Sequence, residues 1–253
     1  MREEWITSRK NPLLVQIRRL ASSRGARRSA GMFLGDGVKL LEEALKWGAP
    51  LETVVYSEGL DGPELPPEVR TVRVPEDVMA SISPMESPQG ALFLCRMWDT
   101  APPPRLEGGR YLVLDGLQDP GNVGTIWRTA DALEADGLLL VHGCADPFGP
   151  KVVRATMGAC FRLPVWETGP ERLAGLLERS GLALYATALR EDTEDIKTAD
   201  LSRSAVVIGS EGRGVSPELL AMSQRALKIP MRERCESLNA AAAAAVVLWE
   251  MGR

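Results

Sequence analysis

The sequence predicts an α/β fold, and three observations support that prediction. Short apolar runs alternate with segments of helical periodicity along most of the chain. The 253 residues are 45% hydrophobic, so they can bury a sizeable core in one large domain or two modest ones. A stretch poor in apolar residues, which contains Pro102, Pro103 and Pro104, predicts a linker. We therefore expect a smaller first domain over residues 1–100, a linker over 101–109 and a second domain over 110–253.

The first 28 residues are strongly basic, although the whole chain has a formal net charge of −4. Their eight basic side chains outweigh Glu3 and Glu4 to give +6, which leaves −10 on the rest of the chain. Such a segment can neutralise the phosphates of a nucleic acid. An ordinary amphipathic helix is an equal alternative, because four apolar residues recur there at helical spacing: Leu13, Leu14, Ile17 and Leu20.

The rest of the first domain is expected to be a small α/β domain. One helix is predicted over residues 38–47, and Gly48 marks its end, as glycine often does at a helix C-terminus. The strand candidates are residues 32–34, 54–56, 72–74 and 91–95.

The second domain is expected to hold a largely parallel sheet with helices on both faces. Its strand candidates are residues 111–114, 138–141, 182–186, 205–208 and 227–229. A last helix is predicted over residues 238–251, and it is apolar on every side. We expect this helix to be buried in a core or in a subunit interface.

Residue counts and missing patterns disfavour several classes of protein. The four cysteines form no Cys-x-x-Cys pair, so buried thiols and no metal site are expected. The single histidine, His142, follows an apolar run and is expected to be structural. No apolar run approaches the roughly 20 residues of a membrane helix, and no signal sequence follows Met1, so we expect a cytoplasmic protein without a membrane partner. Dinucleotide and ATP sites lack their glycine-rich loops.

The first of three informative segments covers residues 119–131 and reads Asp-Pro-Gly-Asn-Val-Gly-Thr-Ile-Trp-Arg-Thr-Ala-Asp. Asn122 is predicted to cap a helix that runs to about Leu133. At 100° per residue, Arg128 lies almost opposite the apolar stripe that contains Ile126 and Trp127. Periodicity alone favours an exposed arginine without a special role.

The other two segments follow later strands. Gly209, Gly212 and Gly214 come directly after an apolar run, where glycines let a ligand approach the backbone, and Ser216 is predicted to cap the next helix. In the third segment, Ile-Pro-Met at residues 229–231 is joined through a polar loop, residues 232–236, to Ser-Leu-Asn at 237–239. Ser237 is a candidate cap for the last helix. Taken singly, each segment is compatible with an ordinary turn.

In this order and spacing, the three segments resemble the signature motifs of the SpoU (TrmH-type) RNA ribose 2′-O-methyltransferases. The similarity is strongest over residues 111–250 and includes residues 151–159. Residues 35–44 are similar to the family's auxiliary RNA-binding domain, with Asp36 where members usually carry glutamate. The resemblance implies a C-terminal trefoil-knotted α/β methyltransferase domain that dimerises and a smaller N-terminal L30e-like α/β domain. General topology rules argue against knots, so the knot enters only through the resemblance.

The resemblance also implies a cofactor and a site. The methyl donor is S-adenosylmethionine, and the positions that match its contacts are Thr187, Gly209, Ile229 and Leu238. The positions that match the family's polar site residues are Asn122, Arg128, Glu211, Ser237 and Asn239. In the family, the counterpart of Arg128 is proposed to remove the proton of the ribose hydroxyl. Binding the target phosphate is the alternative, because a guanidinium is a poor base. Ala240 and Ala241 stand where many relatives have Val-Ser.

We therefore expect 2′-O-methylation of a ribose in structured RNA by a homodimer. The leading domain of about 100 residues favours 23S-type ribosomal RNA over transfer RNA, by analogy of fold. A tRNA ribose 2′-O-methyltransferase is one alternative. A non-catalytic RNA-binding protein that keeps the fold is a second, and the full set of polar site residues disfavours it. A small-molecule or nucleotide-binding α/β enzyme is a third, which the missing phosphate loops and the basic N-terminal segment disfavour.

Overall fold

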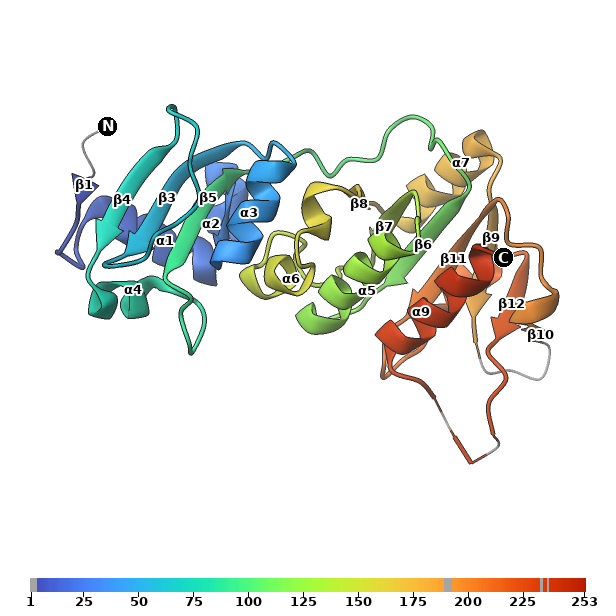
Figure 1. Cartoon of the computed structure of the whole chain (residues 1–253). Helices are drawn as coiled ribbons and strands as arrows, with labels where there is room; N and C mark the ends of the chain where they lie inside the picture. The colour runs from blue at the N-terminus through green and yellow to red at the C-terminus, as the bar shows by residue number, and fades with distance from the viewer. Residues whose placement is uncertain (1–3, 189–192, 233, 236) are drawn as a thin grey trace. The chain divides into compact units, whose positions relative to one another are not determined.

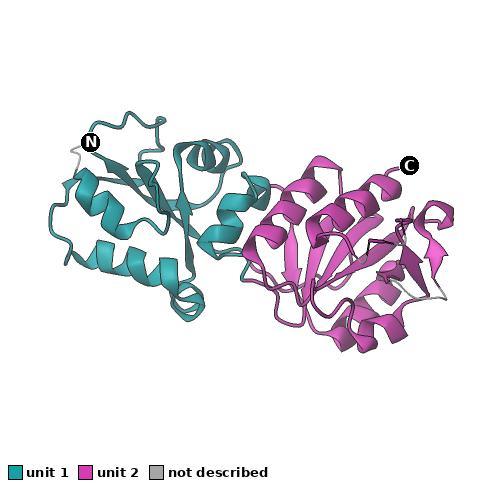
Figure 2. Cartoon of the chain, turned by 90° about the horizontal axis from the view of Figure 1, so that it is seen from below, with its two compact units in different colours: residues 1–98, 146–161 teal, residues 99–145, 162–253 magenta. Residues whose placement is uncertain are grey.

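The structure is a computed structural model that describes the whole chain except residues 1–3, 189–192, 233 and 236 (Figure 1). Arg2 and Glu3 of the basic segment, and Glu236 of the third motif, therefore lie outside the described residues. The chain divides into two compact units (Figure 2). Unit 1 comprises residues 1–98 and 146–161, and unit 2 comprises residues 99–145 and 162–253. Both units combine helices with a sheet, so the α/β prediction is confirmed.

Unit 1 is built on a five-stranded mixed sheet with the strand order β1-β4-β3-β5-β2. Strands β1 and β3 run parallel to β4, whereas β5 is antiparallel to both β2 and β3. The sequence predicts all of these strands except the short edge strand β1. Their bounds are β1 (Glu4–Trp5), β2 (Met32–Asp36), β3 (Leu51–Ser57), β4 (Arg70–Val74) and β5 (Ala91–Arg96).

The basic N-terminal segment forms two helices, α1 (Pro12–Ser22) and α2 (Arg24–Ala30). The four predicted apolar residues of α1 are all buried, so the amphipathic helix is confirmed. One of the basic residues, Arg27, is buried and forms an ion pair within unit 1. Its side chain is 6% exposed, and its Nη2 lies 2.6 Å from Asp146 Oδ2. The other helices before residue 98 are α3 (Val38–Lys46) and α4 (Glu76–Ile82).

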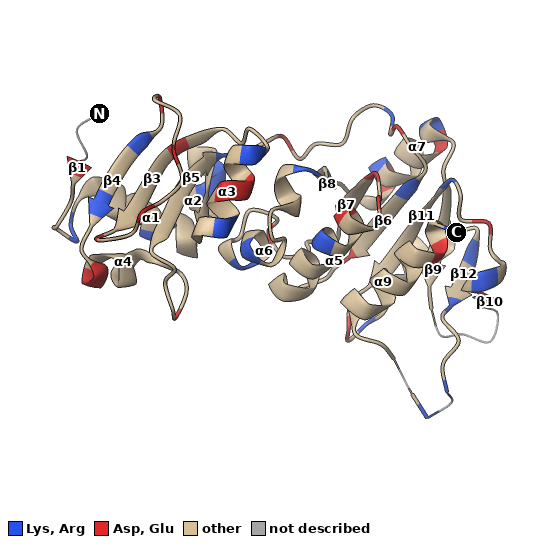
Figure 3. Ribbon diagram, viewed as in Figure 1, with Lys and Arg blue, Asp and Glu red and all other residues tan. Residues whose placement is uncertain are grey.

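A segment from the second half of the sequence completes unit 1. Residues 146–161 contain α6 (Pro150–Ala155) and the short 3-10 helix η1 (Ala159–Phe161), and α6 packs on β2. The Phe148 ring lies 4.7 Å from that of Trp98 and 5.4 Å from that of Phe33. The compact units thus group residues 146–161 with the first part of the chain, and they place residues 99–109, which include the predicted linker, in unit 2. Both α2 and α6 contain basic residues, which are blue on the ribbon in Figure 3.

Unit 2 contains a seven-stranded sheet with the order β10-β12-β9-β11-β6-β7-β8, and all of its strand pairs are parallel. The predicted parallel sheet is thus confirmed. The sequence missed β8 and β10 and placed β12 too late, because Ile229 lies beyond its end. The bounds are β6 (Arg110–Asp115), β7 (Gly137–Val141), β8 (Val165–Glu167), β9 (Ala183–Thr187), β10 (Glu194–Asp195), β11 (Ser204–Gly209) and β12 (Arg225–Lys228).

Helices cover both faces of this sheet (Figures 1 and 2). Helices α5 (Pro120–Ala132) and α9 (Ala240–Met251) pack against each other on one face. Helices α7 (Pro170–Ser180) and α8 (Pro217–Met222) pack against β9 on the other, and η2 (Ile196–Thr198) follows β10. Strand side chains alternate between the two faces, so Tyr111 and Val113 join the α7 core whereas Leu112 and Leu114 point towards α5. None of the helices in the described ranges has the length and apolarity needed to span a bilayer.

Two helix starts differ from the prediction. Asp119 caps α5, because its side chain accepts the Asn122 N–H at 2.7 Å, so Asn122 is not the cap. Pro120 favours the first helical position, which fixes the cap one residue before it. Asn239, not Ser237, caps α9. Its side-chain oxygen accepts hydrogen bonds from the backbone N–H groups of Ala241 and Ala242. The predicted cap at Ser216 is confirmed.

The last helix is buried on one side only. Ala244, Val247 and Leu248 of α9 are buried, whereas Trp249 is 64% exposed. The core of the single chain therefore covers only one side of α9, and an apolar side faces outward; burial of that side in a subunit interface stays a prediction.

Candidate functional site

The predicted motifs meet at the carboxyl edge of the parallel sheet of unit 2. Strand β6 ends at Asp115 and β11 at Gly209, and these two residues are paired across the sheet. The strand order reverses here, since β7 and β8 lie on one side of β6 and β9 and β12 lie on the other side of β11. Open α/β sheets bind ligands at such a switch point, outside the carboxyl ends of the strands.

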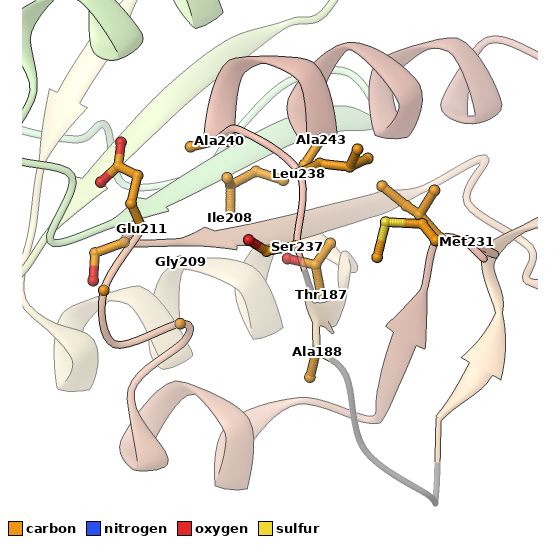
Figure 4. A pocket seen from close by; sticks show the side chains of 14 residues that line it. Thr187, Ala188, Ile208, Gly209, Glu211, Met231, Ser237, Leu238, Ala240 and Ala243 are labelled. Carbon is orange, nitrogen blue, oxygen red and sulfur yellow. The ribbon is translucent and has the colours of Figure 1, made fainter. Parts of the chain in front are cut away.

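A cavity of about 290 Å³ opens beside Gly209 (Figure 4). All four residues that the resemblance assigned to the methyl donor line it: Thr187, Gly209, Ile229 and Leu238. They lie at the ends of β9, β11 and β12 and just before α9. Further apolar lining comes from Ile208, Met231, Ala240 and Ala243, while Glu211 and Ser237 add polar groups. An apolar cavity with a few placed polar groups, close to the lower size limit of about 300 Å³, is typical of a small-molecule site.

The loop after β11 is a tight hairpin, and it leaves no room for a side chain at Gly209. Ser210 and Gly214 exchange two backbone hydrogen bonds, at 3.1 and 2.8 Å. A Cβ atom on Gly209 would overlap the carbonyl carbon of Gly214. Gly214 itself has a φ of 67°, a conformation that favours glycine. The two glycines therefore let the loop fold onto the end of its own strand, at the wall of the cavity.

Three of the predicted polar residues form one hydrogen-bonded chain. Asn122 Nδ2 donates to Glu211 Oε1, and Asn239 Nδ2 donates to Asn122 Oδ1 at 3.1 Å. Because Asn239 also caps α9, these hydrogen bonds connect the start of α5, the start of α9 and the hairpin loop. Ser237 lines the same cavity as Glu211, and its side chain is exposed.

Arg128 stands apart from this network. It is exposed on α5, and its guanidinium makes no hydrogen bond or ion pair with any residue that the structure describes. Its position six residues after Asn122 corresponds to about 9 Å along a helix axis. Ile126 and Trp127 are fully buried, so the predicted orientation of Arg128 away from the core is observed.

Two residues beside the site were not among the predicted functional residues. Asp115 is 4% exposed, and His142 Nδ1 lies 2.6 Å from its Oδ1. The hydrogen bond to Asp115 is the main cause that raises the pKa of His142 above 6.5, and burial opposes it. Both residues line a second cavity of about 620 Å³, which shares Glu211 with the first. The sequence could have indicated Asp115 and His142, because each follows directly after an apolar run, where α/β sheets place site residues.

Comparison with known proteins shows the family. Residues 109–249 match the SpoU rRNA Methylase family, and residues 11–92 match the MRM3-like substrate binding domain. An uncharacterized tRNA/rRNA methyltransferase of Synechocystis is 37% identical, over 98% of this chain and 93% of the relative. The 23S rRNA (guanosine(2553)-2′-O)-methyltransferase RlmP of Bacillus subtilis is 32% identical, over 97% of this chain and 98% of the relative. The crystal structure of AdoMet-bound rRNA methyltransferase from Sinorhizobium meliloti has a TM-score of 0.86 and 30% identity, over 98% of this chain and 97% of that one. As its three motifs predict, this chain belongs to the SpoU rRNA methylase family.

Proposed function

We propose that this chain transfers a methyl group from S-adenosylmethionine to the 2′-oxygen of a ribose in 23S-type ribosomal RNA. The observation that carries the proposal is that the second and third motifs line one cavity, to which the first motif is joined by the hydrogen bond from Asn122 to Glu211. That cavity contains the four residues assigned to the donor and borders the hydrogen-bonded chain of Asn122, Glu211 and Asn239. The chain is an RNA 2′-O-methyltransferase of the SpoU family, and its cofactor is S-adenosylmethionine.

The residues of the cavity fit this donor. S-adenosylmethionine supplies a methyl group on a positively charged sulfonium. Ile208, Ile229 and Leu238 offer apolar surface for the adenine ring and the aliphatic chain. The Glu211 carboxylate lies at one side of the cavity, across from Met231 (Figure 4), where its charge is complementary to a sulfonium.

The polar residues would align the acceptor. Methyl transfer requires the 2′-oxygen in line with the breaking bond and requires removal of its proton. We assign Arg128 to bind the phosphate of the target nucleotide, because a free guanidinium presents a fork of donors that matches two phosphate oxygens. Asn122 and Asn239, fixed by their mutual bond, would hold the ribose, with Ser237 at the same wall. Arg128 as the proton acceptor is the alternative, and it needs neighbours that deprotonate a guanidinium.

The RNA is proposed to bind through the first domain. Residues 11–92 match a substrate binding domain, and the relative RlmP acts on 23S rRNA. We propose that residues 1–100 form an L30e-like RNA-binding domain, that 101–109 is a linker and that 110–253 is the catalytic domain. The exposed basic residues of α1 and α2 support phosphate binding, with Arg27 excluded by its ion pair. A cytoplasmic location and a preference for rRNA over tRNA stay predictions.

A trefoil knot in the catalytic domain is part of the proposal. After β12, on one side of β9, the chain returns to α9, which packs on β11 and α5. Four described residues between β12 and α9 line the donor cavity together with the hairpin loop at the end of β11: Ile229, Met231, Ser237 and Leu238. This return path supports a knot formed by the last segment.

The outward apolar side of α9 supports a homodimer formed by the catalytic domain. Trp249 is 64% exposed there, and large apolar side chains on a surface mark association sites when they form patches with their neighbours. We expect light scattering to give the mass of two chains and Trp249→Glu to shift it towards one. A monomeric unchanged chain across the micromolar range would contradict the dimer.

The test of the function is transfer of labelled methyl groups from S-adenosylmethionine to total RNA that lacks the modification. We expect label in large-subunit ribosomal RNA at one ribose 2′-oxygen, located by sequencing the labelled fragment. Label in transfer RNA alone would favour the tRNA alternative. Donor binding without any transfer to RNA would favour the non-catalytic RNA-binding protein.

A further inference from the structure

A buried carboxylate, that of Asp115, holds the end of the hairpin loop that lines the donor cavity. Asp115 Oδ2 accepts the N–H of Ser216 at 2.6 Å, two residues after the loop ends at Gly214. Ser216 also caps α8. The point at which the loop becomes α8 is therefore fixed by Asp115, at the end of the neighbouring strand.

His142 connects this carboxylate to α8. Its Nδ1 lies 2.6 Å from Asp115 Oδ1, and its Nε2 lies 3.3 Å from Glu218 Oε2 in the first turn of α8. The backbone of His142 has a φ of 54°, a left-handed conformation that is uncommon for residues other than glycine. Gln118 holds the adjoining turn by donating to Gly143 O at 2.6 Å. A strained backbone that is held on several sides is a common sign of a functional position.

The surroundings of the imidazole favour its charged form. Asp115 faces it from β6 and Glu218 from α8, while Glu211 and Arg213 of the hairpin line the same cavity. The nearby Cys144 thiol donates to backbone oxygens of residues 114 and 141. The pKa of His142 is raised from 6.5, chiefly by its bond to Asp115. A doubly protonated ring donates to both carboxylates, whereas a neutral ring that keeps Nδ1–H turns a lone pair towards Glu218.

We infer that His142 is a positioning residue for donor binding: its imidazolium clamps Asp115 and Glu218 and thereby holds the Ser210–Gly214 hairpin against the donor cavity. The inference rests on the proposed donor site. The clamp is complete below about pH 6.5 and is lost as the pH rises through the raised pKa of the folded protein. Donor affinity is therefore highest on the acidic side of that titration. By linkage, a bound donor raises the pKa of His142 further.

The experiment uses the full, tag-free chain. His142 is the only histidine in the sequence, so its ring resonances in an NMR titration are assigned directly. The expected result is a pKa above 6.5 that rises when S-adenosylmethionine is added. Titration calorimetry is expected to show donor affinity that falls by about tenfold across the same pH range, a loss typical of one charge-assisted bond.

Two variants and a control separate positioning from general stability. Asn is tolerated at positive φ and keeps a donor towards Asp115 but not the charge, so His142→Asn should bind the donor weakly and without the pH dependence. Glu218→Gln keeps a hydrogen-bond acceptor for the ring and should move the loss of affinity to lower pH. Glu171→Gln removes the corresponding first-turn glutamate of α7 and should change neither. Donor binding by His142→Asn that equals the unchanged chain at every pH would overturn this inference alone. Failure of the unchanged chain to bind the donor would overturn the proposed function as well.

Discussion

Replacing Arg128 by alanine is expected to reduce methyl transfer by at least about 100-fold, the usual loss when one charged donor is removed from a transition state. Donor affinity and the free energy of unfolding should stay close to those of the unchanged chain. The reason is that the Arg128 side chain is exposed and bonded to no described residue, so its removal breaks nothing in the fold. Single-turnover methyl transfer, calorimetric donor binding and thermal unfolding measure the three quantities separately.

Two matched variants define what Arg128 does. Arg105→Ala removes another exposed arginine of unit 2, in the proline-rich segment, and should leave the rate unchanged. Arg128→Lys keeps the charge but loses the fork, so phosphate binding predicts partial activity. An Arg128→Ala chain that methylates RNA at the normal rate would remove this residue from the site. A lysine variant as inactive as the alanine variant would favour a role specific to the guanidinium.

Replacing Gly209 by alanine is expected to weaken donor binding by about 5- to 150-fold, which corresponds to the roughly 1–3 kcal/mol typical of an overpacked site. The added methyl group has no space, because the Gly214 carbonyl carbon occupies its position. The hairpin must therefore move away from the end of β11, and it takes one wall of the cavity with it. Calorimetry with S-adenosylmethionine measures the loss, and chemical unfolding is expected to show a stability decrease of similar size.

Gly212 provides the matched control within the same loop. A Cβ atom at Gly212 meets no atom within 4 Å, and its φ is not in the left-handed region. Gly212→Ala should therefore unfold at the same denaturant concentration as the unchanged chain, which separates the overlap at Gly209 from a general intolerance of side chains in this loop. Equal donor affinity in Gly209→Ala and the unchanged chain would show that the loop adapts and would contradict a role of its close approach in the site.

Regular features of the fold were predictable because their signals are local. The central strands β6, β7 and β11 are apolar runs, and α1 shows its buried stripe at positions 13, 14, 17 and 20. Short edge strands were missed, since β1 and β10 span two residues each and carry no pattern of their own. The helix caps were predicted at Asn122 and Ser237 instead of Asp119 and Asn239, because several capping residues lie close together in the sequence and only the backbone geometry selects one.

The sequence by itself determined the α/β class, the parallel sheet of the second half and the residues of the second and third motifs that line one cavity. Local periodicity and a family pattern were sufficient for that, because each depends on neighbours along the chain. Only the tertiary structure placed residues 146–161 in unit 1, where Asp146 pairs with Arg27 across 119 positions. It alone joined Asp115 to His142 and Ser216, which lie 27 and 101 positions away. Contacts at such separations depend on which strands lie side by side, and no local pattern in the sequence records that order.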